Sequence, residues 1–88
     1  MVSKVRPWTI VLSEYLDLPF LMRKAGVPVV SVRSAREALE CLRFCCPSRV
    51  VIDMECHRSH QVLIYVQDRY PGVPVEAGDQ VVSRLLAS

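Results

Sequence analysis

The residue best placed to do chemistry is Asp53, which ends the largely apolar run Arg49–Asp53. An uninterrupted run of Val and Ile is typical of a strand that is covered on both faces, as in parallel sheets. Open α/β sheets place their ligands and reactive groups beyond the carboxyl ends of such strands. Asp53 is therefore a candidate site residue, and the alternative interpretation is that it only begins a loop or caps a turn.

A second set of side chains carries the donor atoms that metal ions prefer. It comprises Cys41, Cys45, Cys46, Cys56, His57 and His60. Structural zinc sites usually pair C-x₂₋₄-C with H-x₃₋₅-H, and only two residues separate His57 from His60. Cys41 and Cys45 also fit the apolar face of a helix, where free cysteines act as small core residues. A metal- or redox-responsive protein stays open as an alternative, whereas a Cys-His hydrolase is not expected.

The composition indicates one folded domain over residues 1–88. Hydrophobic residues make up 51% of the chain, which argues against disorder. A chain of this length buries only about 60–65% of its unfolded surface, so its stability is marginal without help. The high apolar content for this size predicts that another chain covers part of the surface.

Charge and hydropathy exclude several classes of protein. The net charge is only +2 and the Lys and Arg residues are scattered, which does not favour nucleic-acid binding. No stretch approaches the roughly 18–20 apolar residues of a membrane span, and no signal-peptide pattern is present. We expect a cytoplasmic protein with reduced cysteines.

Strand and helix patterns alternate along the chain. Strands are predicted at Pro7–Leu12, Val27–Val32 and Arg49–Asp53 and from Val73, and helices at residues 17–25, 35–44, 60–70 and 80–87. Ser34 and Glu37 have the spacing of a capping box, and Ser59 and Asp79 are candidate N-caps. Alternation with short connections predicts an α/β fold with an open parallel sheet and flanking helices.

Three segments in this order resemble one known family. They are Gly26–Leu39, Pro47–Met54 and Asp68–Val75. They are similar to corresponding parts of the receiver domain of bacterial response regulators, over residues 8–79. The resemblance implies a flavodoxin-like fold with strand order 2-1-3-4, a phosphoacceptor at Asp53, and a signalling partner such as a histidine kinase.

The chain departs from this family at the positions that serve the phosphoacceptor. The resemblance implies Mg²⁺ ligands at Glu14, Asp53 and the carbonyl of Glu55, but Ser13 replaces one of two family acids. The switch hydroxyl is replaced by Asp79, whose charge would repel a phosphoryl group. We therefore expect a non-enzymatic, atypical receiver that acts through protein–protein contacts. Phosphorylation of Asp53 with bound Mg²⁺ is the alternative.

The sequence also lacks the family's fifth strand, with its Lys, and the final helix. The fourth strand would then lie at an edge of the sheet, where the charge of Glu76 opposes uncontrolled pairing. Without the final helix, apolar surface on the first helix would be uncovered. We expect a homodimer that buries the edge or these faces.

Overall fold

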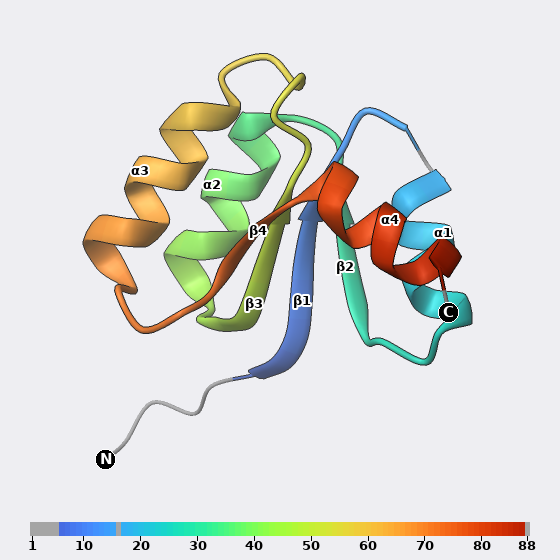
Figure 1. Ribbon diagram of the computed structural model, residues 1–88. Helices are drawn as coiled ribbons and strands as arrows, with labels where there is room; N and C mark the ends of the chain where they lie inside the picture. Colours follow the sequence, from blue (N-terminus) through green and yellow to red (C-terminus); the bar gives the residue numbers. More distant parts are fainter. Residues whose placement is uncertain (1–5, 16, 88) are drawn as a thin grey trace.

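In the computed structural model, which describes residues 6–15 and 17–87, a parallel sheet lies between two pairs of helices (Figure 1). Along the chain the elements are β1 (Arg6–Leu12), α1 (Asp17–Lys24), β2 (Val29–Val32), α2 (Ala35–Phe44), β3 (Pro47–Ile52), α3 (Ser59–Arg69), β4 (Val75–Ala77) and α4 (Gly78–Ala87). The strands are ordered β2-β1-β3-β4, and each pair is parallel. The predicted α/β fold with strand order 2-1-3-4 is confirmed, and its topology is flavodoxin-like.

The two central strands explain the unbroken apolar runs in the sequence. Residues 10–12 of β1 and 50–52 of β3 are fully buried, because helices cover both faces of the sheet at this point. β3 begins two residues before the predicted start, at Pro47, and Asp53 lies just beyond its end. β2 and β4 are the edge strands, and both are shorter than predicted.

The α2–α3 face of the sheet carries the larger core. Ile10, Leu12, Val50 and Ile52 pack there against buried residues of the two helices, including Ala38, Leu42, Val62 and Val66. The predicted N-cap Ser34 of α2 is confirmed, and Glu37 accepts the N–H of Arg33 in place of that of Ser34. The Glu37 N–H donates to Ser34 Oγ at 3.2 Å, and the Arg33 N–H donates to Glu37 Oε1 at 3.2 Å. This reciprocal pair fixes where α2 begins.

The α1–α4 face carries a smaller core, formed by Val11, Leu18, Met22, Val29, Val51 and Val81. Apolar surface on α1 was expected to be uncovered, and this holds for Phe20 but not for Leu18 and Met22, which are buried. The chain turns to the side of α1 directly after the three residues of β4, and α4 covers Leu18 and Met22. Burial of the Val81 side chain, which faces the sheet, stabilises α4 in this position.

Two predicted N-caps are wrong, Ser59 by one residue and Asp79 by two. α4 begins at Gly78, so Asp79 lies in its first turn. α3 begins at Ser59, and Arg58 occupies the N-cap position with φ 60° and no side-chain capping bond. Ser59 Oγ instead donates to the Met54 carbonyl at 3.1 Å, which holds the β3–α3 loop against the start of the helix.

Glu76 links β4 to the α1–α4 face. Its carboxylate accepts hydrogen bonds from Arg84 of α4 and from Arg49 of β3, the latter at 3.1 Å. The Arg84 hydrogen bond, helped by the positive charges of both guanidinium groups, lowers the pKa of the Glu76 carboxyl. The negative charge expected on this edge strand, that of Glu76, is therefore paired with two arginines. In the described part of the chain, no helix has the length and apolar character needed to cross a membrane.

Candidate functional site

The candidate site lies at the carboxyl ends of β1 and β3. These neighbouring strands mark the point where the order of the sheet reverses, the usual ligand-binding place in open α/β folds. Ser13 follows β1 and Asp53 follows β3. The Asp53 N–H donates to the Leu12 carbonyl at 2.8 Å, and the Ser13 N–H donates to the Val32 carbonyl at 3.1 Å. Backbone bonds between strands therefore fix both residues.

The two carboxylate oxygens of Asp53 have different surroundings. Oδ1 accepts a hydrogen bond from the Glu55 N–H at 3.1 Å, which is the contact of an Asx turn. Oδ2 lies 3.5 Å from Ser13 Oγ, at the long limit of a hydrogen bond, and Ser13 Oγ accepts the Tyr15 N–H at 3.1 Å. Asp53 thus caps the turn after β3 and also presents its second oxygen at the end of β1.

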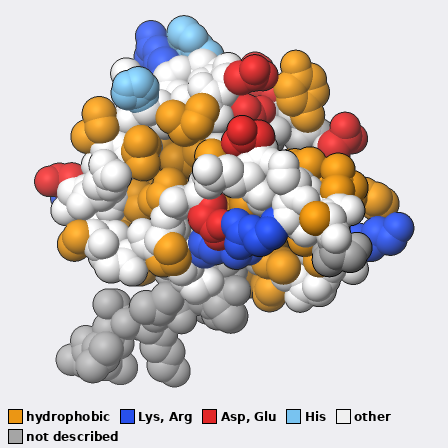
Figure 2. Space-filling view, viewed as in Figure 1, with side chains coloured by type: hydrophobic (Ala, Val, Ile, Leu, Met, Phe, Trp, Pro, Cys, Tyr) orange, Lys and Arg blue, Asp and Glu red, His pale blue; other side chains and the backbone are white. Residues whose placement is uncertain are grey.

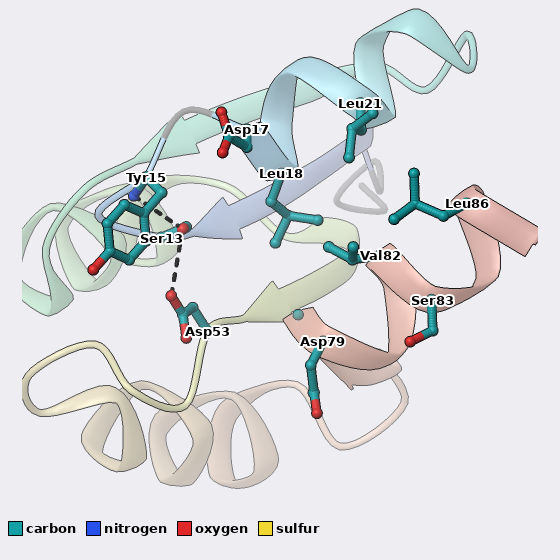
Figure 3. A pocket seen from close by; sticks show the side chains of 11 residues that line it. Ser13, Tyr15, Asp17, Leu18, Leu21, Asp53, Asp79, Val82, Ser83 and Leu86 are labelled. Atoms are coloured by element: carbon teal, nitrogen blue, oxygen red, sulfur yellow. Dashed lines mark hydrogen bonds between the residues drawn. The ribbon is translucent and has the colours of Figure 1, made fainter.

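A groove of about 590 Å³ runs from Asp53 between α1 and α4. We call it the α1–α4 groove, and it is lined by Ser13, Tyr15, Asp17, Leu18, Leu21, Asp53, Gly78, Asp79, Val82, Ser83 and Leu86. Figure 3 shows the apolar side chains of the two helices facing one another across it. Asp17 and Asp79 stand on the first turns of these helices, and the described lining residues include no Lys or Arg.

Gly78 allows α4 to begin against the end of β3. A Cβ atom at this position would lie 3.0 Å from Leu18 Cδ2 and 3.5 Å from the Cα of Asp53. A side chain would therefore push α4 away from α1 or displace Leu18. Sequence reasoning missed this role, although a glycine between a short strand and a helix is a sign of close backbone approach.

Glu14, the second predicted magnesium ligand, lies on the other side of the sheet edge. It follows Ser13 directly, and consecutive side chains at the end of a strand project to opposite faces. Glu14 is exposed and lines a separate pocket with Cys56 and several arginines. Burial raises the pKa of the Cys56 thiol, and the negative charges of Glu14 and Asp53 raise it further.

The residues at Asp53 fit a resident Mg²⁺ ion poorly. Mg²⁺ sites in proteins usually combine one or two carboxylates with several waters in near-octahedral geometry. Of the predicted set Glu14, Asp53 and Glu55, only the Asp53 side chain lines the groove, where the Ser13 hydroxyl stands in place of a second acid. No three His, Cys, Asp or Glu side chains gather to hold a metal ion within the described ranges. The magnesium site stays a prediction.

The cysteines lie at two ends of the molecule. Cys56 is buried at the carboxyl edge of the sheet, and its thiol lies 3.9 Å from the Arg33 carbonyl. Cys45 and Cys46 follow α2 at the opposite edge, where Cys45 lines a small pocket with Trp8 and Pro47. All four thiols are free. The structure therefore does not bring Cys56 to the other cysteines, and a redox-responsive function stays a prediction.

Comparison with known proteins adds no family assignment. A scan against protein-family models finds no match, and neither do searches of curated proteins and of solved structures. What relates the chain to a wider group is its flavodoxin-like topology.

Proposed function

We propose that this chain is an atypical receiver-like signalling module that acts through protein–protein contacts, and that its α1–α4 face forms a homodimer. The strand order 2-1-3-4 and an aspartate after β3 support the receiver-like interpretation. The observation that carries the proposal is the apolar α1–α4 groove beside Asp53, together with the large apolar side chains exposed on α1, on α4 and on the loop before α1.

Three large apolar side chains are exposed on the α1–α4 face, and two of them, Tyr15 and Leu86, line the groove. Tyr15, Phe20 and Leu86 are 65%, 62% and 69% exposed, on the β1–α1 loop, α1 and α4 respectively. Apolar surface rimmed by polar residues marks interaction sites in soluble domains. An aromatic side chain buries about 150–250 Å² at an interface, so these residues supply much of the apolar contact that a dimer needs.

The charge distribution favours a second copy of this chain as the occupant. α1 begins with Asp17 and ends with Arg23 and Lys24, and α4 begins with Asp79. Both helices begin at the carboxyl edge of the sheet (Figure 1). A two-fold axis can pair the α1–α4 faces of two copies in antiparallel orientation. The acidic first turns of α1 and α4 in one copy then lie against the basic last turn of α1 in the other. Closed homodimers use such self-complementary surfaces.

Size-exclusion chromatography with light scattering at low micromolar concentration tests this proposal. The wild-type chain is expected at twice the mass of the monomer, and Phe20→Glu and Leu86→Glu are expected at the mass of the monomer. Ile64→Glu is the matched control, because Ile64 is also exposed but lies on α3. A monomeric wild type, or dissociation by Ile64→Glu alone, contradicts the proposed interface.

Phosphorylation of Asp53 is the alternative function. The feature that favours it is the Oδ2 atom of Asp53, which faces Ser13 at the end of β1. Phosphoryl transfer requires positive charge to neutralise the phosphoryl oxygens. The groove instead adds Asp17 and Asp79 to Asp53. Incubation with Mg²⁺ and acetyl phosphate is expected to leave the intact mass unchanged. A gain of one phosphoryl group that Asp53→Asn abolishes would establish the alternative, with a histidine kinase as the expected donor.

A further inference from the structure

A second pocket lies at the carboxyl edge of the sheet, on the α2–α3 side. It has a volume of about 330 Å³ and is lined by Glu14, Arg33, Ser34, Ala35, Arg36, Cys56, His57 and Arg58. Three arginines converge there from two separate connections. Arg33 follows β2, Arg36 lies in the first turn of α2, and Arg58 precedes α3. We call this site the arginine pocket.

The three arginines have no carboxylate partners within the described part of the chain. The ion pairs there join Arg43 to Glu40, and Arg49 and Arg84 to Glu76. Arg33, Arg36 and Arg58 are exposed and make none of these pairs. Like charges that share a pocket repel one another, and an anion bound between them removes this cost. Figure 2 shows basic and histidine side chains next to one another at the upper left of the molecule.

The start of α2 adds backbone donors to the arginine pocket. The first N–H groups of a helix have no acceptor within the helix. Ser34 Oγ accepts the Glu37 N–H and Glu37 accepts the Arg33 N–H, so the capping box uses neither the Ala35 nor the Arg36 N–H. Both residues line the pocket. The positive end of the helix dipole and these N–H groups favour a bound anion.

We propose that the arginine pocket binds the phosphate group of a small phosphorylated ligand. Arg guanidinium groups bind phosphate oxygens in a bidentate manner, and three of them with two helix N–H groups suit a dianion. The one carboxylate in the pocket, Glu14, leaves the lining positively charged and can accept a hydrogen bond from a hydroxyl group of the ligand. The volume suits a phosphate ester of a few carbons, because small-molecule sites begin at about 300 Å³.

The carboxylates around the arginine pocket favour a small ligand over nucleic acid. A nucleic-acid surface needs a continuous basic face, and the exposed carboxylates of Glu14, Glu37 and Glu55 interrupt it here. The arginine pocket also lies across the sheet from the α1–α4 groove. Its ligand is therefore separate from the proposed dimer contact, and different variants test the two.

An NMR titration of the full chain tests the proposal, with inorganic phosphate and glycerol phosphate as probes at constant ionic strength. We expect both probes to shift the amide signals of Ala35, Arg36 and Arg58. Arg36→Gln and Arg58→Gln should each weaken binding at least fivefold, and the spectra report whether the variants are folded. Arg43→Gln is the matched control, because Arg43 lies on the same helix but pairs with Glu40.

The outcomes separate the sources of the phosphate. Tighter binding of glycerol phosphate supports an ester as the ligand, and equal binding supports free phosphate. Three results overturn the proposal: no saturable shift with either probe, an equal loss of affinity in Arg43→Gln, and tenfold tighter binding of a short single-stranded oligonucleotide. The last result would assign the arginines to a nucleic-acid surface.

Discussion

The α1–α4 groove and the arginine pocket lie at the same edge of one sheet, but their chemistry is opposite. The groove is apolar and lined by three carboxylates, whereas the pocket is lined by three arginines, a histidine and the start of a helix. Neighbouring residues of one loop serve different sites. Ser13 lines the groove and Glu14 lines the pocket. The alternation of side chains at a strand end therefore decides which site a polar residue joins.

The two faces also differ in the size of their cores and in where their pockets lie. α2 and α3 pack over the larger core, and the arginine pocket lies beyond it at the loops. α1 and α4 pack over the smaller core and leave apolar side chains of both helices at the surface. A charged pocket at the loops suits a small ligand, whereas an apolar groove between two helices suits another protein.

Gly78→Leu tests whether the two sites are independent, and we expect it to have the largest effect. The new side chain must enter the contact between α4, Leu18 and Asp53, where a Cβ already lies 3.0 Å from Leu18 Cδ2. Such overpacking costs about 1–3 kcal/mol of the free energy of unfolding, measured by urea denaturation. The same variant should lose the dimer and retain phosphate binding in the arginine pocket.

Gly72→Leu is the control for this substitution. No atom lies within 4 Å of a Cβ built at Gly72, so the free energy of unfolding should change by less than about 0.5 kcal/mol. Loss of phosphate binding in a folded Gly78→Leu variant would show that the groove and the pocket are coupled through the sheet edge.

Ser34 lies at the start of α2, on the face of the sheet opposite Gly78. The Ser34→Ala substitution is expected to lower the free energy of unfolding by about 1 kcal/mol. The substitution removes the acceptor of the Glu37 N–H at the start of α2, beside the arginine pocket. Urea denaturation measures the loss. Ser83→Ala is the control, because Ser83 is exposed on α4 and lines the groove. Equal effects of the two substitutions would contradict the capping role of Ser34.

Much of the fold was predictable because local patterns and the parallel sheet agree. The unbroken run before Asp53 indicates a buried central strand, and the spacing of Ser34 and Glu37 indicates the start of α2. Both predictions are confirmed. The strand order followed from the resemblance of three segments, because periodicity alone does not order strands.

The arrangement of the site was less predictable, because it depends on contacts between distant residues. The last helix was predicted at residues 80–87, but its packing against α1 depends on the length of β4 and on the close approach at Gly78. Glu14 and Asp53 are separated because their side chains, which follow the ends of β1 and β3, lie on opposite faces of the sheet. The arginine pocket joins residues of two loops, and scattered charges in a sequence do not reveal such a cluster.

Acid should weaken the attachment of α4 in the wild type more than in Glu76→Gln. Arg84 and Arg49 lower the pKa of the Glu76 carboxyl below its ordinary value of 4.5. The stabilisation is therefore fully present above that value and is lost as the pH falls through the lower, folded-state pKa. Between about pH 5 and pH 3 the wild type should lose up to about 1 kcal/mol more than Glu76→Gln.

Urea denaturation across this pH range measures the difference. Glu40→Gln is the control, because Glu40 pairs with Arg43 on the exposed side of α2, where both side chains are well solvated. Its pH dependence should match that of the wild type. If Glu76→Gln also follows the wild-type curve, the link between Glu76 and α4 does not stabilise the fold.

The smallest expected effect concerns Cys56, whose thiol lies near carboxylates of both sites. Burial is the main cause of its raised pKa, and the charges of Glu14 and Asp53 add to it. Because the thiolate is the reactive form, Glu14→Gln and Asp53→Asn should each speed alkylation of Cys56, by less than about tenfold. Iodoacetamide labelling followed by peptide mass spectrometry measures the rates. Cys41 is the internal control. It lies on α2, and its pKa is raised by burial and by Cys45, not by Glu14 or Asp53. Comparable acceleration by both variants would show that carboxylates of both sites act on the Cys56 thiol. Acceleration of Cys41 as well would indicate local unfolding instead.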